Sequence, residues 1–232
     1  MINIKTPTTI IYATFVKREN RFVATVEKNN NHYRAHVPSS GRMQELLVKG
    51  AEVILTPSAP GGRTDYKLLL VKYQGNWVSI DSLLPNRIIK KALLSDQLTE
   101  LSGYQNVKSE HSFGHSRFDF FLQAGSASDC WLEVKSVTLV ENGIAKFPDA
   151  PTERGAKHVL ELIEAVKRGY RAVVMFVVQR SDAGCFKPHG DKDPQFAHAL
   201  SLAATTGVEI YARKCDVSPE GVILGGQIPV RL

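Results

Sequence analysis

The sequence predicts a mixed α/β protein built from a small β-barrel followed by an α/β domain with a partly parallel sheet. Three observations predict this fold. Short strand-like runs separated by turn residues fill the first third of the chain, helical and strand-like runs alternate after Leu84-Pro85, and one later strand is apolar throughout. Evenly spaced short strands are typical of barrels, whereas alternating helices and strands are typical of parallel sheets. We therefore expect domains at residues 1–84 and 85–232.

The first part reads as six short strands and one helical turn. Its strands are expected at Ile10 to Lys17, Phe22 to Glu27, His32 to Val37, Val53 to Thr56, Lys67 to Tyr73 and Trp77 to Ile80, with the helical turn at Met43 to Leu47. Residues that tolerate turn conformations separate most of them, as at Asn29-Asn30-Asn31 and Gln74-Gly75-Asn76. Strands at this spacing with one small helix indicate a barrel of OB type.

The second part reads as helices alternating with strands. Helices are expected at Asn86 to Leu94, Thr152 to Arg168 and Gln195 to Thr205, and strands at Asn106 to His111, Arg117 to Leu122, Trp131 to Thr138, Ala172 to Val178 and Val208 to Ala212. The run Ala172 to Val178 has no polar alternation, which predicts a central strand covered on both faces. The expected order is αβββαβαβ, which begins with αβββαβ.

The charge is concentrated in the first part. The chain has a formal net charge of +6, and residues 1–85 hold 11 Lys and Arg against 6 Asp and Glu, which leaves 18 against 17 in the remainder. An excess of basic residues favours a polyanion such as nucleic acid. The three cysteines are far apart and form no CxxC pair, and no long apolar run occurs. We therefore expect a cytoplasmic protein with no membrane segment, no disulfide framework and no structural zinc.

Three charged residues stand among large apolar neighbours on two predicted strands. Asp119 lies in Arg117 to Leu122, and Glu133 and Lys135 lie in Trp131 to Thr138. Side chains alternate across a strand, so Glu133 and Lys135 share one face. If the two strands are neighbours, Asp119 and Glu133 converge on one Mg²⁺ or Mn²⁺, with Glu110 as a candidate third ligand and Lys135 as the group that orients water or stabilises the transition state.

The spacing of these residues also fits a solvated sheet face. In that alternative, Glu133 and Lys135 form a surface ion pair that contributes ~0–1 kcal/mol. A second pair, Arg154 and Lys157, begins the helix that follows, where free amides favour phosphate. The alternative for this pair is an ordinary polar stripe opposite the apolar face of the helix.

Longer stretches resemble the SfsA family, the sugar fermentation stimulation proteins. The resemblance rests on Arg117 to Leu122, Leu132-Glu133-Val134-Lys135-Ser136-Val137-Thr138-Leu139, Phe147-Pro148-Asp149-Ala150, Thr152-Glu153-Arg154-Gly155-Ala156-Lys157-His158, Glu100-Leu101-Ser102-Gly103-Tyr104 and Val208-Glu209-Ile210. It implies a prokaryotic DNA-binding protein, linked to transcription regulation of sugar metabolism, with an OB-like domain and a PD-(D/E)XK restriction-endonuclease-like domain. In that motif the acidic residues are Asp119 and Glu133 and the lysine is Lys135, while Phe118 stands where proline is usual.

A loop of the first part carries a second family segment. The pattern HxPNTGxM is present as His36-Val37-Pro38-Ser39-Ser40-Gly41-Arg42-Met43, with Ser39 in place of the usual Asn. Ser39, Ser40 and Arg42 are candidate phosphate contacts, and Gly41 allows close backbone approach. The alternative is that Ser40 caps a helix. Arg34, next to Tyr33, is a further candidate contact, and Tyr33 and Trp77 are candidate stacking platforms.

Three functions remain open from the sequence. The first is a DNA-binding protein with little sequence preference whose acidic site is either vestigial or used only to bind a metal. The second is an active Mg²⁺- or Mn²⁺-dependent phosphodiesterase that cleaves DNA or RNA through Asp119, Glu133 and Lys135. The third is an oligosaccharide-binding barrel, which the basic charge of residues 1–85 disfavours. A homodimer is compatible with DNA binding, although no interface is evident in the sequence.

Overall fold

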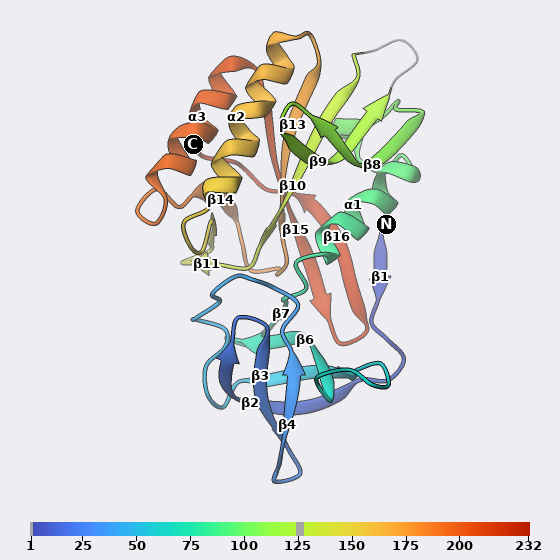
Figure 1. Ribbon diagram of the computed structural model, residues 1–232, viewed down its shortest axis with the longest axis vertical. Coiled ribbons are helices and arrows are strands. Elements are labelled where there is room, and N and C mark those ends of the chain that lie inside the picture. The colour runs from blue at the N-terminus through green and yellow to red at the C-terminus, as the bar shows by residue number, and fades with distance from the viewer. Residues whose placement is uncertain (1, 124–127) are drawn as a thin grey trace.

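The computed structural model describes residues 2–123 and 128–232, which form two packed parts (Figure 1). The lower part is a barrel of six strands in the order β4-β3-β2-β5-β6-β7, closed by pairing between β4 and β6. Its strands are β2 (Ile11–Asn20), β3 (Val23–Lys28), β4 (Asn31–His36), β5 (Glu52–Pro57), β6 (Tyr66–Tyr73) and β7 (Asn76–Ser79). All six predicted strands are therefore present. Met43 to Leu47 forms only a hydrogen-bonded turn, with the Leu47 amide donating to the Met43 carbonyl.

The upper part is built on a seven-stranded sheet in the order β1-β16-β15-β13-β10-β9-β8. Its strands are β1 (Asn3–Lys5), β8 (Asn106–Phe113), β9 (Ser116–Gln123), β10 (Cys130–Val137), β13 (Arg171–Val178), β15 (Glu209–Ser218) and β16 (Gly221–Gln227). The helices are α1 (Leu84–Leu94), α2 (Glu153–Lys167) and α3 (Pro194–Thr206), with a short 3-10 helix at Thr99–Leu101. A small sheet of β11 (Val140–Glu141), β12 (Ile144–Phe147) and β14 (Cys185–Pro188) lies beside them.

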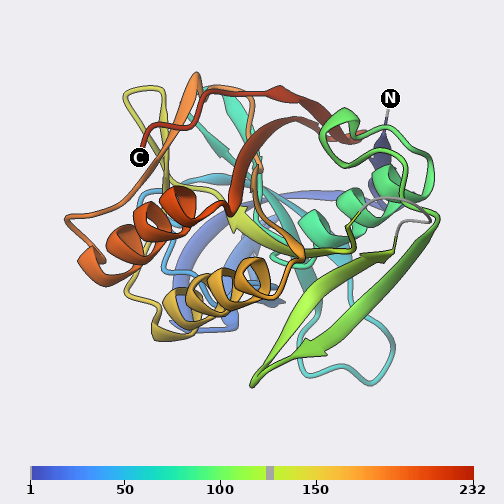
Figure 2. The same ribbon diagram turned by 90° about the horizontal axis from the view of Figure 1, so that it is seen from above.

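The central strand β13 pairs in parallel with both β10 and β15, as its continuous apolar sequence predicts. Helices α2 and α3 lie together on one side of the sheet and α1 lies on the other (Figure 2). Phe176 on β13 belongs to the core under α2 and α3, whereas its neighbours Met175 and Val177 belong to the core under α1. Both faces of β13 are thus buried at the centre of the sheet.

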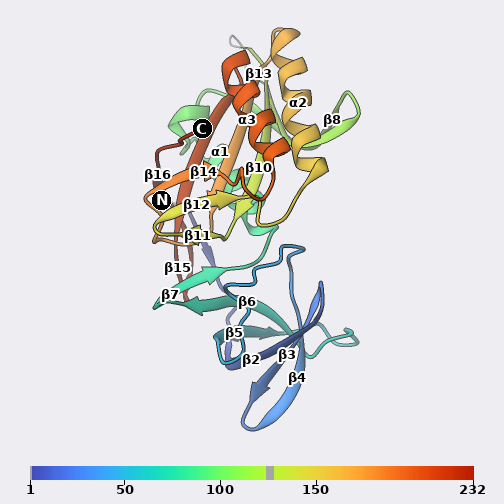
Figure 3. The same ribbon diagram turned by 90° about the vertical axis from the view of Figure 1, so that its left-hand side faces the viewer.

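The first strand departs from the expected domain division. Residues 1–84 were expected to form the barrel, but β1 pairs antiparallel with β16 at the edge of the second sheet, with Asn3 opposite Ile223. Ile2 is buried in the core under α1. A short apolar run has no local pattern that reveals a partner more than two hundred residues away. The chain therefore begins in the α/β part, crosses into the barrel and returns at α1 (Figure 3).

The two parts are held together by hydrogen bonds and charge. The Ser79 amide of β7 donates to the Gln179 carbonyl at 3.1 Å, directly after β13. The fully buried Arg180 places its guanidinium 5.2 Å from the Tyr73 ring of the barrel and pairs with Asp182 at 2.6 Å. The buried carboxylate of Asp81 accepts from Lys67 of β6 and Arg87 of α1, both at 2.9 Å. These contacts fix the barrel against the sheet and set the shape of the space between them.

Candidate functional site

Strands β9 and β10 bring Asp119 and Glu133 to one place, as their predicted adjacency required. The two strands pair antiparallel, with Leu132 opposite Phe120, and the ladder stops there. Beyond that point the Asp119 carboxylate takes the place of a backbone acceptor, because its Oδ2 accepts from the Val134 amide at 2.8 Å. Residues 124–127 of the connection between the strands lie outside the described residues.

The end of the ladder also interrupts the alternation of side chains along β9. Phe118 is buried in the core under α2, but Phe120, two residues later, is buried in the core under α1. A regular strand would place both rings on one face. Asp119 thus stands at an irregular point of the strand, and its other oxygen, Oδ1, accepts from the Asn86 amide nitrogen of α1 at 2.5 Å.

Glu133 is a buried carboxylate with only one of its oxygens satisfied. Its Oε1 lies 2.6 Å from Lys135 Nζ and 2.6 Å from His158 Nδ1 of α2. Its Oε2 is buried and, within the described residues, has no hydrogen-bond partner. A buried charged oxygen without a partner is costly, so Glu133 Oε2 is a candidate to coordinate a cation or accept a hydrogen bond from a ligand. The interpretation of Glu133 and Lys135 as a solvated surface pair is therefore wrong, since the Glu133 residue is 4% exposed.

His158 bridges Arg154 and Glu133 through its two ring nitrogens. Arg154 Nε donates to His158 Nε2 at 3.4 Å. The other ring nitrogen, Nδ1, lies 2.6 Å from Glu133 Oε1, where it can donate a hydrogen bond to the carboxylate. The pair Arg154 and His158 lies one helical turn apart, and together they hold the Glu133 carboxylate in one orientation.

The surroundings shift the pKa values of the two carboxyl groups in opposite directions. Burial, and then the neighbouring charge of Glu133, raise the pKa of Asp119 to about 6. Burial also raises the pKa of Glu133, but the charge of Lys135 and the hydrogen bond from His158 outweigh it and hold that pKa below its usual value. Two neighbouring carboxylates repel each other when both are ionised, and a bound cation would stabilise the ionised pair.

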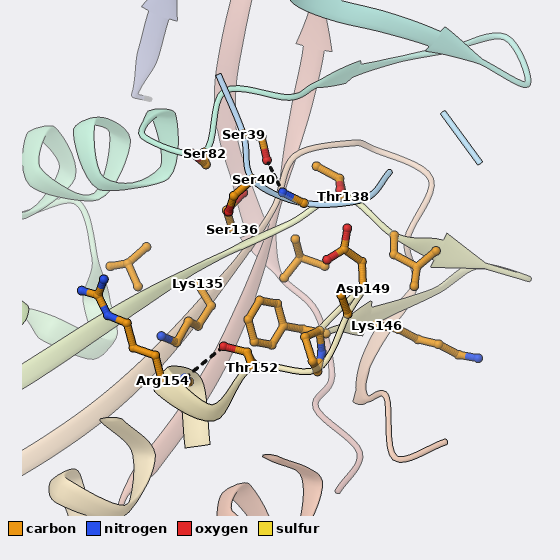
Figure 4. Close-up of a pocket in the computed structure, with 18 of the residues that line it drawn as sticks. Ser39, Ser40, Ser82, Lys135, Ser136, Thr138, Lys146, Asp149, Thr152 and Arg154 are labelled. Atoms are coloured by element: carbon orange, nitrogen blue, oxygen red, sulfur yellow. Dashed lines mark hydrogen bonds between the residues drawn. The ribbon is translucent and has the colours of Figure 1, made fainter. Parts of the chain in front are cut away.

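Asp119, Glu133 and Lys135 line a pocket of about 470 Å³ between the barrel and the α/β part, which we call the interdomain pocket. Ser39 and Ser40 of the barrel lie on one side of it, and Lys135, Thr152 and Arg154 lie on the other (Figure 4). Thr152 Oγ1 caps α2 by accepting from the Gly155 amide at 3.0 Å. The pocket therefore joins carboxylates, hydroxyls and cationic groups from both parts of the chain.

The loop that carries Ser39 and Ser40 is held by hydrogen bonds on both sides. Arg18 of β2 donates to the carbonyls of Gly41 and Arg42 at 2.8 and 2.7 Å. On the other side, the Met43 amide donates to Asp149 Oδ2 at 3.2 Å. Ser39 Oγ accepts from the Gly41 amide, so Ser39 rather than Ser40 closes the local turn. We call residues 39–42 the strap, of which Ser39, Ser40 and Gly41 line the interdomain pocket and Arg42 lines the cavity beside it.

The predicted site residues fall into two groups. Asp119, Glu133, Lys135, Ser39, Ser40, Gly41 and Arg154 all line the interdomain pocket, and Arg42 and Lys157 line cavities beside it. Glu110 does not join them, because it lies on an irregular turn of β8 with φ +55° and pairs with Arg117 at 2.8 Å on the surface. Arg34 pairs with Glu19 on the barrel, outside the lining of this pocket.

Tyr33 and Trp77 also lie outside the lining of the interdomain pocket. Tyr33 packs edge-on against Tyr66, and Trp77 packs against Tyr12. Sequence reasoning missed Asn86, Asp149 and His158. His158 could have been recognised, because it stands in the family segment and one helical turn after Arg154. Asn86 could not, because it lies on a different element, far from Asp119 in the sequence.

No group of three or more His, Cys, Asp or Glu residues converges as a metal site in the part of the chain that the structure describes. Two carboxylates, those of Asp119 and Glu133, do lie together in the interdomain pocket. Oxygen ligands suit hard divalent cations, which often retain water and bind phosphate oxygens beside one or two protein carboxylates. Asp119 and Glu133, with the free Glu133 Oε2, fit that kind of cation.

Comparison with known proteins shows the family of the chain. Residues 83–221 match the family model described as the sugar fermentation stimulation protein RE domain, and residues 16–80 match the SfsA N-terminal OB domain. The chain belongs to the SfsA family. Its mixed α/β architecture, an OB-like barrel followed by a restriction-endonuclease-like domain, is the one that the resemblance predicted. Within the described residues, no helix has the length and apolar character to span a bilayer.

Relatives and a solved SfsA structure match nearly the whole chain. The sugar fermentation stimulation protein homolog of Desulforamulus reducens is 51% identical, covering 96% of this chain and 93% of that protein. The homolog of Symbiobacterium thermophilum is 47% identical over 95% and 94%. The structure of Pyrococcus furiosus SfsA in complex with Ca²⁺ superposes with a TM-score of 0.91 at 31% identity and covers 100% of both chains.

Proposed function

We propose that this SfsA-family chain binds nucleic acid, with DNA as the favoured polymer, and holds a Mg²⁺ or Mn²⁺ ion at Asp119 and Glu133 in the interdomain pocket. One observation carries the proposal: a buried carboxylate oxygen, Glu133 Oε2, has no partner among the described residues and stands beside a second carboxylate. The solved Pyrococcus furiosus relative, which was determined with Ca²⁺, supports a divalent cation.

The surrounding groups suit a phosphate. Lys135 and Arg154 are cationic and line the interdomain pocket, and Ser39, Ser40 and Thr152 add hydroxyls. A bound divalent cation offsets phosphate charge and lowers the pKa of a bound water. Contacts of this kind involve the backbone of the nucleic acid and carry no sequence information, so we expect little sequence preference and a steep salt dependence.

A second candidate function is hydrolysis of the phosphodiester at the same site. Lys135 Nζ favours it, since it is held 2.6 Å from Glu133 Oε1 within the pocket and can stabilise charge that develops on a phosphate. In this candidate, Asp119 and Glu133 are the metal-holding carboxylates and His158 keeps Glu133 in place. The regulatory role and the homodimer remain predictions.

The test uses labelled single- and double-stranded DNA and RNA incubated with the purified chain in Mn²⁺ or EDTA. Binding that falls steeply with salt is expected from the first function. Cleavage in Mn²⁺ that is lost in Asp119→Ala, but kept in the matched surface variant Asp191→Ala, establishes the second. Failure to bind any of these polymers contradicts both functions.

A further inference from the structure

Two further cavities share lining residues with the interdomain pocket. A cavity of about 820 Å³, here the barrel-side cavity, shares Arg21, Ser40, Gly41, Ala150 and Pro151 with the pocket as common walls. A cavity of about 520 Å³, here the hairpin-side cavity, lies against the β8–β9 hairpin and shares Arg154 with the pocket. The two outer cavities share no lining residue with each other, so the interdomain pocket, with Asp119 and Glu133, is the member that adjoins both, and we call the three together the row.

The interdomain pocket, in the middle of the row, is small compared with a nucleic-acid duplex. Its volume, about 470 Å³, lies within the ~300–1,000 Å³ of pockets that hold one drug-sized ligand. The strap lines it from the barrel side and is hydrogen-bonded to Arg18 and Asp149, so part of the pocket wall is backbone held by these side chains. A B-form double helix, whose major groove alone is about 12 Å wide, can present one backbone at the pocket but cannot lie within it. A single strand can enter it.

The two ends of the row carry positive charge. On the barrel side, Arg21 and Arg42 are exposed, and neither guanidinium is paired with an acid within the described residues. On the hairpin side, Arg117, Arg154 and Lys157 line the cavity, together with one acidic residue, Glu153. Lys157 is only loosely held, 3.8 Å from Glu161. A row of cationic groups that enters and leaves an acidic centre follows the path of a phosphate backbone.

An exposed aromatic ring stands next to the barrel-side end. Phe22 is 46% exposed, follows Arg21 in the chain, and donates its amide to Asn20 Oδ1 at 2.9 Å. Asn20 and Arg21 both line the barrel-side cavity. Aromatic rings beside a basic groove stack on bases, and such a contact is worth about 1–3 kcal/mol per base in single-strand-binding proteins. Only an unpaired base offers its face for such a contact.

We propose that the three cavities form one passage for a single strand of nucleic acid, which runs from the Phe22 and Arg42 end, along the strap, past Asp119 and Glu133, to Lys157. The preferred substrate is then single-stranded DNA or RNA, or a single-stranded tail on a duplex, because a single strand can follow all three cavities whereas an intact double helix contacts only their openings. This inference rests on the proposed function, because it names the polymer form that the same site binds.

The test measures fluorescence anisotropy of labelled strands at one fixed salt concentration in EDTA, where no metal-dependent cleavage occurs. The probes are a DNA strand of about 16 nucleotides, the upper site size of an OB barrel, the RNA strand of the same sequence, and a blunt DNA duplex. We expect at least one single strand to bind about tenfold more tightly than the duplex, and the stronger of DNA and RNA identifies the polymer.

The variants probe both ends of the passage. Phe22→Ala, Arg42→Gln and Lys157→Gln are each expected to weaken single-strand binding about five- to tenfold, which corresponds to one lost stacking or phosphate contact. The matched controls Leu202→Ala, Arg63→Gln and Lys167→Gln remove exposed side chains of the same kinds away from the passage and are expected to leave binding unchanged. Circular dichroism establishes that each variant is folded.

The outcomes separate this inference from the proposed function. If the duplex binds as tightly as the single strands, or if the variants at both ends bind like their controls, the passage is refuted while nucleic-acid binding stands. If none of the polymers binds, the proposed function fails and the passage fails with it. Tighter single-strand binding with losses at both ends supports the passage.

Discussion

His158 Nδ1 lies 2.6 Å from Glu133 Oε1, while His158 Nε2 accepts from Arg154. The imidazole thus connects a helix to the buried carboxylate of a strand. It sets the direction in which the free oxygen Glu133 Oε2 points, because the opposite oxygen is held by two donors. The arrangement is typical of residues that orient a metal ligand rather than bind the metal themselves.

Substitution of His158 tests this positioning role. His158→Phe removes the donor to Glu133, and we expect a loss of divalent-cation affinity of about 10–100-fold. His158→Asn keeps a donor near the position of Nδ1 and is expected to restore most of that loss. Calorimetric titration with Mn²⁺ measures both variants, with the exposed His198→Asn as the control. Equal affinities for the Phe and Asn variants would remove the positioning role.

Neutralising Asp119 is expected to stabilise the metal-free protein. The pKa of Asp119 is raised in the folded state to about 6 from 3.8, so the ionised form is penalised on folding. The penalty is full above about pH 6, shrinks between about pH 6 and 4, and vanishes when both states are protonated. Asp119→Asn should therefore raise the free energy of unfolding by roughly 1–3 kcal/mol at about pH 8.

Urea denaturation in EDTA measures this difference. At about pH 4, where the carboxyl is protonated in the folded wild type, the advantage of the variant should be much smaller than at about pH 8. A variant that is less stable than the wild type at the higher pH would mean that the hydrogen bonds from Asn86 and Val134 outweigh burial and the charge of Glu133.

Gly41 offers a test of the strap. A Cβ at this position would lie 2.9 Å from Asp149 Oδ2, the acceptor of the Met43 amide. Gly41→Ala should displace Asp149, loosen the strap and weaken nucleic-acid binding about three- to tenfold, at a cost in folding stability of about 1 kcal/mol. Gly190→Ala is the control, because its new Cβ would meet Ala197 at an ordinary 3.7 Å. If both variants bind like the wild type, the strap does not shape the site.

Arg180 anchors the α/β part to the barrel. It is fully buried, pairs with Asp182 at 2.6 Å and packs over the Tyr73 ring. Arg180→Met removes a buried charge partner, and we expect a loss of about 2–4 kcal/mol in the free energy of unfolding. Thermal and urea unfolding measure the loss, with the exposed Arg63→Met as control. An unchanged free energy of unfolding would show that the barrel is held by other contacts.

The elements of the fold were largely predictable because their signals are local. The apolar run of β13, the turn residues of the barrel and the amphipathic spacing of α2 each follow from a short stretch of sequence. The edge strand β1 was not, since Asn3 pairs with Ile223 across almost the whole chain. The small strands β11, β12 and β14 are too short to carry a periodic pattern.

The site was predictable only in part, because several of its contacts join residues that are far apart in the sequence. Alternation placed Glu133 and Lys135 on one face, and the structure brings Lys135 Nζ to Glu133 Oε1. Alternation did not place Asp119, which sits where the β9–β10 ladder stops, nor Glu110, whose positive φ turns it toward Arg117. Asn86 and His158 come from helices on opposite sides of the sheet and become neighbours of the site only in the folded chain.

The most direct test of the account is calorimetric titration of Mn²⁺ into the wild type, Glu133→Gln and Glu110→Gln. Glu133→Gln keeps the size of the side chain but removes the charge of the unpartnered buried oxygen, and we predict that it lowers Mn²⁺ affinity by roughly tenfold or more. Glu110→Gln should bind Mn²⁺ like the wild type, because Glu110 lies on the surface beside Arg117. Unchanged affinity in Glu133→Gln would contradict a metal site at Asp119 and Glu133.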